Sequence, residues 1–218
     1  MKRIVLTIAI LLGMTFGIFA QNGSGTYAPI VLPPHGQLDD QDASISATTQ
    51  TITLSSGSNW VSFNVDITLD NLKAALVAAL PGTQMVIKAK NNEQLTYTGT
   101  KWKGNMASLD VAQMYMIQVA SASTISVAGL RVVSAEHPVT IVPGANWIAF
   151  PLSTSMTPTE AFAGFALIGD VIKNKDNQSA AYNGTKWKGS LTTLEPGKGY
   201  IFTSSQTNDR TLVFPTAK

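Results

Sequence analysis

Gly99-Thr100-Lys101-Trp102-Lys103-Gly104 recurs without change as Gly184-Thr185-Lys186-Trp187-Lys188-Gly189, 85 residues further along the chain. Six identical residues in register, one of them a tryptophan, do not arise by chance, so the sequence contains an internal repeat. Other matches extend on both sides of this block. We therefore expect two tandem modules, module 1 at residues 49–134 and module 2 at residues 135–218.

A second repeated block precedes the first in each module. Gly57-Ser58-Asn59-Trp60-Val61-Ser62-Phe63 is answered by Gly144-Ala145-Asn146-Trp147-Ile148-Ala149-Phe150. Apolar and other side chains alternate from residue 60 to 65 and from 147 to 152, which predicts a strand in each module. Val61 and Phe63 then lie on one face and Trp60 on the other. Another strand is expected just before each block, at 51–54 and at 139–142.

One short helix is expected in each module after this strand. In module 1, Leu69, Leu72, Leu76 and Leu80 form an apolar stripe that ends at Pro81-Gly82. In module 2, Thr157-Pro158-Thr159-Glu160 has the pattern of a capping box, with proline at the first helical position.

Short strands follow each helix. In module 1 they are expected at residues 86–90, 95–97, 100–103, 114–120 and 124–133. Asn183-Gly184 predicts a two-residue hairpin turn, and Thr98-Gly99 occupies the same place in module 1. That turn would pair Tyr97 with Thr100. The expected fold class is α+β, mainly antiparallel β, with two tandem small β-sandwich or half-barrel modules that each carry one short helix.

The amino-terminal residues predict export. Lys2 and Arg3 precede an apolar run that ends at Ala20, the pattern of a cleavable signal peptide at residues 1–20. A membrane anchor is the alternative, but the run is short for a span and contains two glycines. Residues 21–48 are rich in Gly, Pro, Ser, Gln and Asp and predict a flexible linker. No later segment is apolar enough to cross a bilayer, so no transmembrane segment is expected after cleavage.

The composition limits the classes of partner. The chain has 15 basic and 13 acidic residues, and cleavage after Ala20 would remove Lys2 and Arg3 and so make the two numbers equal. A general attraction to nucleic acid is therefore not expected. The chain has no cysteine, so stability must come from packed cores rather than from disulfides, and thiol chemistry is excluded.

The repeated motifs resemble a known repeat. Gly-x-Asn-Trp-(Ile/Val)-x-Phe, Gly-Asp-x-Ile-Lys, Tyr-x-Gly-x-x-Trp-x-Gly-Ser-Leu-x-x-Leu and Pro-Gly-Lys-Gly-Tyr look like a repeat of secreted and surface proteins of Gram-negative bacteria. Module 2 matches nearly throughout, for example at residues 169–173 and 196–200. Module 1 departs from the pattern at residues 109–115. The resemblance implies an extracytoplasmic location and a β-rich module, and it carries no activity.

Nothing in the sequence predicts an enzyme, a cofactor or a metal site. Neither histidine has a partner at ligand or triad spacing, and only Asp110 and Glu195 recur among the carboxylates. There is no Gly-rich phosphate loop after a strand and no His-Glu-x-x-His. We therefore expect a protein that binds rather than catalyses.

Two sets of recurring residues are candidates for a ligand surface. The lysines recur in four equivalent pairs, and they are Lys88, Lys90, Lys101, Lys103, Lys173, Lys175, Lys186 and Lys188. They would form either a basic face for an anionic glycan or a solvated face that protects strand edges. Trp60 and Trp147 form the second set. Their indoles would either stack on a sugar ring or cover a second small core or the seam between the modules.

The function expected from these features is that of a non-catalytic secreted or cell-surface binding or adhesion protein, with carbohydrate as the candidate ligand. The alternative is a structural or accessory subunit of a surface complex that binds another protein by strand pairing or through its module faces.

Overall fold

A computed structural model describes residues 19–21, 27–29 and 47–215, and the chain divides into two compact units, 1–42 and 43–218. In the first unit, β1 (Phe19–Gln21) pairs with β2 (Tyr27–Pro29) as antiparallel strands. The expected signal peptide and linker otherwise lie outside the described residues, except that the linker's last two residues already belong to strand β3. Both modules belong to the second unit.

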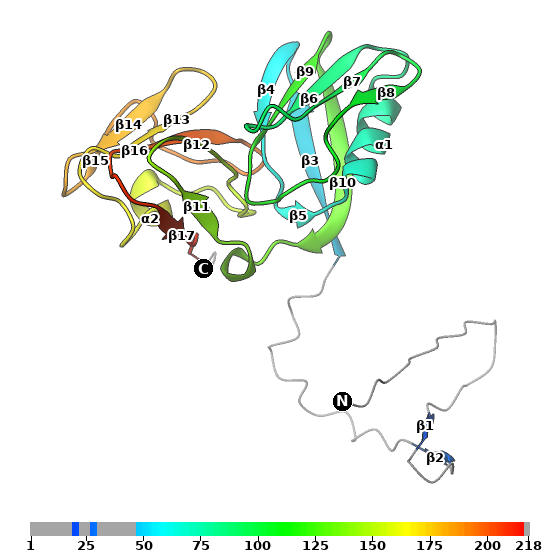
Figure 1. Cartoon of the computed structure of the whole chain (residues 1–218), viewed down its shortest axis with the longest axis horizontal. Helices are drawn as coiled ribbons and strands as arrows, with labels where there is room; N and C mark the ends of the chain where they lie inside the picture. The colour runs from blue at the N-terminus through cyan, green and yellow to red at the C-terminus, as the bar shows by residue number, and fades with distance from the viewer. Residues whose placement is uncertain (1–18, 22–26, 30–46, 216–218) are drawn as a thin grey trace. The chain divides into compact units, whose positions relative to one another are not determined.

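Module 1 is built from two antiparallel sheets and one helix (Figure 1). The larger sheet has the order β4 (Gly57–Val61), β9 (Tyr115–Val119), β6 (Met85–Lys88), β7 (Gln94–Tyr97) and β8 (Trp102–Gly104). The smaller sheet has the order β3 (Ala47–Leu54), β10 (Ser123–Arg131) and β5 (Val65–Asp66). Helix α1 (Leu69–Ala79) packs against β10.

Module 2 repeats this strand order in its larger sheet. That sheet has the order β12 (Gly144–Ile148), β16 (Tyr200–Ser204), β13 (Val171–Lys173), β14 (Ser179–Tyr182) and β15 (Trp187–Gly189). The smaller sheet pairs β11 (Val139–Ile141) with β17 (Arg210–Leu212), and the helix is α2 (Pro158–Ala161). A short 3-10 helix, η2 (Ser134–Glu136), joins the modules. The sheets are open and antiparallel, which confirms the α+β, mainly β, fold class.

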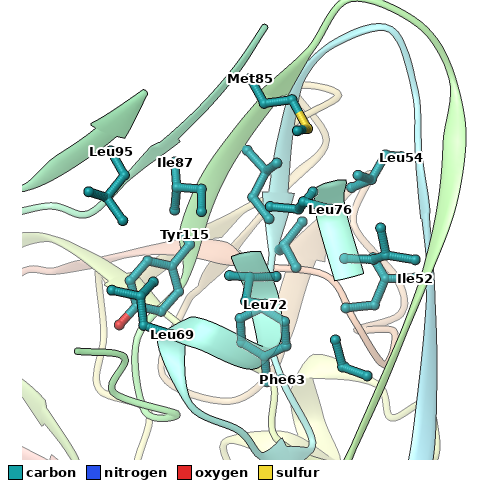
Figure 2. Close-up of a cluster of buried hydrophobic side chains, with 14 of the residues drawn as sticks. Ile52, Leu54, Phe63, Leu69, Leu72, Leu76, Met85, Ile87, Leu95 and Tyr115 are labelled. Atoms are coloured by element: carbon teal, nitrogen blue, oxygen red, sulfur yellow. The ribbon is translucent and has the colours of Figure 1, made fainter. Parts of the chain in front are cut away.

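The two helices begin where the sequence predicts. Thr68 caps α1 by accepting a hydrogen bond from the backbone N–H of Asn71, and the helix ends at Ala79, with Leu80 as its C-cap before Pro81-Gly82. Leu72 and Leu76 are fully buried between the helix and the sheets (Figure 2). At α2 the expected capping box of Thr157 and Glu160 is present.

Helix α2 is much shorter than α1, with 4 residues against 11. The chain leaves the helix at Phe162, and Gly164 then adopts a positive φ that suits glycine. Aromatic packing takes the place of the leucine stripe in this module. The Phe162 ring lies 5.4 Å from the Trp187 ring and 5.2 Å from the Phe202 ring, measured between centroids.

The expected two-residue hairpin turn is wrong in both modules. Tyr97 lies opposite Trp102, and Tyr182 lies opposite Trp187, so each turn holds four residues. In both turns the first residue donates its backbone N–H to the carbonyl oxygen of the fourth, Thr98 to Lys101 at 3.0 Å and Asn183 to Lys186 at 3.2 Å. In module 2 the Asn183 Oδ1 also accepts the backbone N–H groups of Thr185 and Lys186. The register moves by two residues, which leaves each remaining ladder residue on its predicted face.

The motif glycine that closes each hairpin allows a close approach of the two backbones. A Cβ at Gly104 would lie 1.9 Å from the carbonyl oxygen of Gln94, and one at Gly189 would lie 2.0 Å from that of Ser179. Only glycine fits at these positions, which explains why the repeated block ends in glycine.

The strand expected across residues 60–65 is interrupted. Strand β4 ends at Val61 and β5 starts at Val65, because Ser62 pairs with module 2 instead of continuing the ladder. Its backbone N–H donates to the carbonyl oxygen of Gly197 at 3.1 Å. The strand expected at 147–152 likewise ends at Ile148, and the first strand of module 1 begins earlier than predicted, at Ala47.

The two modules contact each other through the same backbone pairing made twice, which we call the module junction. Val61 bridges to Lys198, and in the reciprocal position Ile148 bridges to Gln113. The N–H of Ala149 donates to the Ala112 carbonyl at 3.1 Å, as that of Ser62 does to Gly197. Each module therefore uses equivalent segments to bind the other, as subunits do in a two-fold dimer.

Candidate functional site

In module 1, Trp60 and Lys88 were predicted as separate candidates, and they lie on one face of the larger sheet. Trp60 is opposite Met116, Met116 is opposite Lys88, and Lys88 is opposite Gln94. Directly opposed residues share a face, so these four side chains form one row across four strands. Lys88 is exposed and the other three are half-buried.

Module 2 carries an equivalent row. Trp147 is opposite Ile201, Ile201 is opposite Lys173, and Lys173 is opposite Ser179. All four side chains are half-buried. Each row thus combines an indole, an apolar side chain, an ammonium group and a polar side chain.

The other six candidate lysines lie outside these two rows. Lys101 and Lys186 lie in the hairpin turns and not in the ladder. Lys103 lies opposite Thr96, and Lys188 lies opposite Ala181, on the edge strands.

The remaining two, Lys90 and Lys175, follow β6 and β13. The Lys90 ammonium group donates to the carbonyl oxygen of Ala145 at 2.6 Å, whereas Lys175 lies 3.8 Å from the Asp176 carboxylate. Thr96 is two residues from Gln94, so Lys103 shares the sheet face of Lys88, and by the same alternation Lys188 shares that of Lys173. Lys90 and Lys175 instead make single contacts beyond the ends of their strands.

The four tryptophans fall into two groups. The Trp102 ring packs 5.1 Å from that of Tyr97, and the Trp187 ring lies 5.4 Å from that of Tyr182, both against the module cores. Trp60 and Trp147 lie on the outer strands β4 and β12, next to the module junction.

A cleft of about 320 Å³ opens beside Trp60, between the two modules. From module 1 it is lined by Trp60 and by residues 51–53 of β3. The module 2 wall consists of the loop between β13 and β14 and the segment that leads into β16. The polar side chains of this wall are Asn174, Lys175, Asp176, Gln178, Thr193, Glu195 and Lys198.

Most of these polar residues could not be predicted as a site from the sequence. The available signals were the recurrence of a carboxylate at Asp110 and Glu195 and of a lysine at Lys90 and Lys175. Apart from Lys175, which recurs as Lys90, the others have different side chains at the equivalent positions of module 1, and all come together only where module 2 faces Trp60.

The floor of the cleft includes Tyr200, whose hydroxyl holds the polar segment in place. It accepts the backbone N–H of Glu195 at 2.7 Å, and the Tyr115 hydroxyl accepts that of Asp110 at 2.6 Å. Burial raises the pKa of both tyrosines above the usual value, since the phenolate would lose its hydration, and nearby carboxylates act in the same direction.

These raised pKa values predict a loss of stability in alkali. Above pH ~10 an unfolded chain releases the two phenolic protons, whereas the folded chain retains them, so the free energy of unfolding falls as pH rises. We expect urea unfolding between about pH 8 and 11 to show this decline. Tyr200→Phe lacks the hydroxyl, so its free energy of unfolding should be about 1 kcal/mol lower than that of wild type at neutral pH. As the pH rises, the free energy of unfolding of this variant should then fall less steeply than that of wild type. An identical slope in wild type and Tyr200→Phe would contradict the assignment.

Within residues 19–21, 27–29 and 47–215, no group of three or more His, Cys, Asp or Glu side chains is placed to hold a metal ion. Over the same residues, no helix has the length and apolar character needed to span a bilayer. No family model, curated protein or solved structure matches the chain at a significant level.

Proposed function

We propose that this chain is a non-catalytic extracytoplasmic binding or adhesion protein whose ligand is a carbohydrate. The observation that carries the proposal is the row Trp60, Met116, Lys88 and Gln94, with its counterpart in module 2. A flat indole matches the apolar face of a sugar ring, and the ammonium and amide groups beside it match the ring hydroxyls.

The proposed location rests on the amino-terminal sequence. A basic start, an apolar run and a small residue at position 20 form the pattern of an export signal, and the motifs resemble those of surface proteins. A cysteine-free chain with two packed cores suits a protein that keeps its fold without disulfides.

A glycan array tests this function. The purified chain is expected to bind at least one oligosaccharide class, and the double variant Trp60→Ala/Trp147→Ala should bind at least about tenfold more weakly. The matched control is Lys101→Ala/Lys186→Ala, since both lysines lie in the hairpin turns away from the rows, and this variant should bind as wild type does. Absence of any glycan binding, together with a stoichiometric protein partner, would instead support an accessory subunit.

A further inference from the structure

We propose that the cleft between the modules is the carbohydrate site, that it takes an uncharged sugar, and that each chain has one such site despite the duplication. This inference rests on the proposed function and narrows it to one place and one ligand class. It gives different roles to Trp60 and Trp147, which the sequence treats as equivalent.

The walls of the cleft come from both modules. Trp60 contributes the aromatic surface, and its carbonyl oxygen accepts the backbone N–H of Gly199 at 3.0 Å, which fixes the module 2 segment beside it. Asn174 and Thr193 contribute an amide and a hydroxyl from the facing loops. A volume of about 320 Å³ is near the lower end for ligand sites and is enough for one or two sugar rings.

The charges in the cleft favour an uncharged ligand. Two lysines, Lys175 and Lys198, line it together with two carboxylates, Asp176 and Glu195. Lys175 and Asp176 are 3.8 Å apart and offset each other. A sulfated or uronic acid group would gain little from this balanced surface, whereas sugar hydroxyls can both donate to the carboxylates and accept from the ammonium groups.

The reciprocal position beside Trp147 has a different arrangement. Lys90 is the counterpart of Lys175, and the next residue is Asn91 where module 2 has Asp176. Without that carboxylate, the Lys90 ammonium group reaches across the junction to the carbonyl oxygen of Ala145, two residues before Trp147. The two equivalent lysines therefore differ in their contacts: Lys90 crosses the junction to the strand of Trp147, whereas Lys175 lines the cleft beside Trp60.

The two single tryptophan variants test the inference. A printed panel of neutral, sulfated and uronic acid oligosaccharides would identify the class, and calorimetry with the best neutral binder would give the stoichiometry. We expect one site per chain, affinity that does not weaken at high salt, a loss of about tenfold or more in Trp60→Ala, and wild-type affinity in Trp147→Ala. Thermal unfolding of both variants checks that each is folded.

A second variant keeps the test independent of the tryptophan. Glu195→Ala removes a cleft carboxylate whose side chain is exposed, and we expect it to weaken neutral sugar binding several-fold. Glu136→Ala removes an exposed carboxylate of η2, outside the cleft, and is the matched control. Equal losses in Trp60→Ala and Trp147→Ala, two sites per chain, or a preference for sulfated sugars would overturn this inference and leave the proposed function standing. Absence of binding to every sugar on the panel would overturn both.

Discussion

Replacing Arg210 with methionine is expected to lower the free energy of unfolding by about 3–5 kcal/mol, because it leaves the Asp170 carboxylate buried without its cation. Asp170 is fully buried, and the Arg210 side chain is 14% exposed. Nη2 of Arg210 lies 2.9 Å from both carboxylate oxygens. Urea unfolding of wild type and Arg210→Met measures the loss.

Further contacts fix the positions of the Arg210 and Asp170 side chains. The guanidinium lies over the Phe165 ring, 4.5 Å from its centroid, and donates to the Phe165 carbonyl and the Ser204 hydroxyl. Asp170 also accepts the backbone N–H groups of Leu167 and Ser205. Without Arg210, the Asp170 carboxylate keeps only uncharged donors, which are these two N–H groups and the Ser205 hydroxyl at 3.4 Å, and loses its one charged partner.

Module 1 indicates how the loss can be reversed. Its residue equivalent to Asp170 is Met85, which is buried in the apolar core, and the strand position equivalent to Arg210 is Ser123. The double variant Asp170→Met/Arg210→Met should therefore recover most of the stability, to within about 1 kcal/mol of wild type. The remaining loss is expected from the backbone N–H groups of Leu167 and Ser205, which no longer have the carboxylate as their acceptor. A double variant as unstable as the single one would show that the pair is not an isolated unit.

Replacing Gly199 with methionine is expected to separate the modules, with a cost of about 1–3 kcal/mol or more from overpacking. A Cβ at position 199 would lie 2.6 Å from the Cβ and 2.7 Å from the Sδ of Met114. Met114 is fully buried there. Thermal unfolding should show a lower transition, and acrylamide quenching should show Trp60 more open to solvent, since the Gly199 N–H no longer holds its carbonyl.

Gly199 and Met114 occupy equivalent positions in the two modules, which supplies the control. Because the junction is reciprocal, these two positions face each other, and the Met114 side chain fills the space that Gly199 leaves. Met114→Gly/Gly199→Met exchanges the two sizes and should regain most of the stability lost in the single variant. A double variant less stable than Gly199→Met would contradict this complementary packing. The same packing explains why module 1 departs from the Pro-Gly-Lys-Gly-Tyr pattern at this position.

Short-range signals predicted the parts of the fold that depend on neighbouring residues. The leucine stripe from Leu69 to Leu80 and the capping box at Thr157 each act within a few residues, so the sequence placed both helices correctly. The alternation placed Val61 and Phe63 on one face for the same reason, and both prove to be buried. The hairpin was misplaced in both modules because the pairing continues for one residue beyond Tyr97 and Tyr182, where Thr98 bonds to Lys101 and Asn183 to Lys186, and dipeptide preferences do not fix that register.

Only part of the candidate site could be predicted from the sequence. Trp60 and Lys88 were identified one by one, and strand alternation placed each on a face of its own strand. Their common row depends on the sheet order, in which β9 lies between β4 and β6 although it follows both in the chain. The polar wall of the cleft depends on a contact between segments more than a hundred residues apart, such as Ser62 and Lys198.

By itself, then, the sequence determined the repeat, the β-rich class and the ends of the helices, because periodicity and capping act between near neighbours. Tertiary structure alone decided that two copied modules pair reciprocally, that Met114 meets Gly199, and that Trp60 borders a cleft while Lys90 reaches toward the strand of Trp147. The physical reason is that packing at the junction depends on the sizes and charges of residues far apart in the chain, and equivalent positions there carry different side chains.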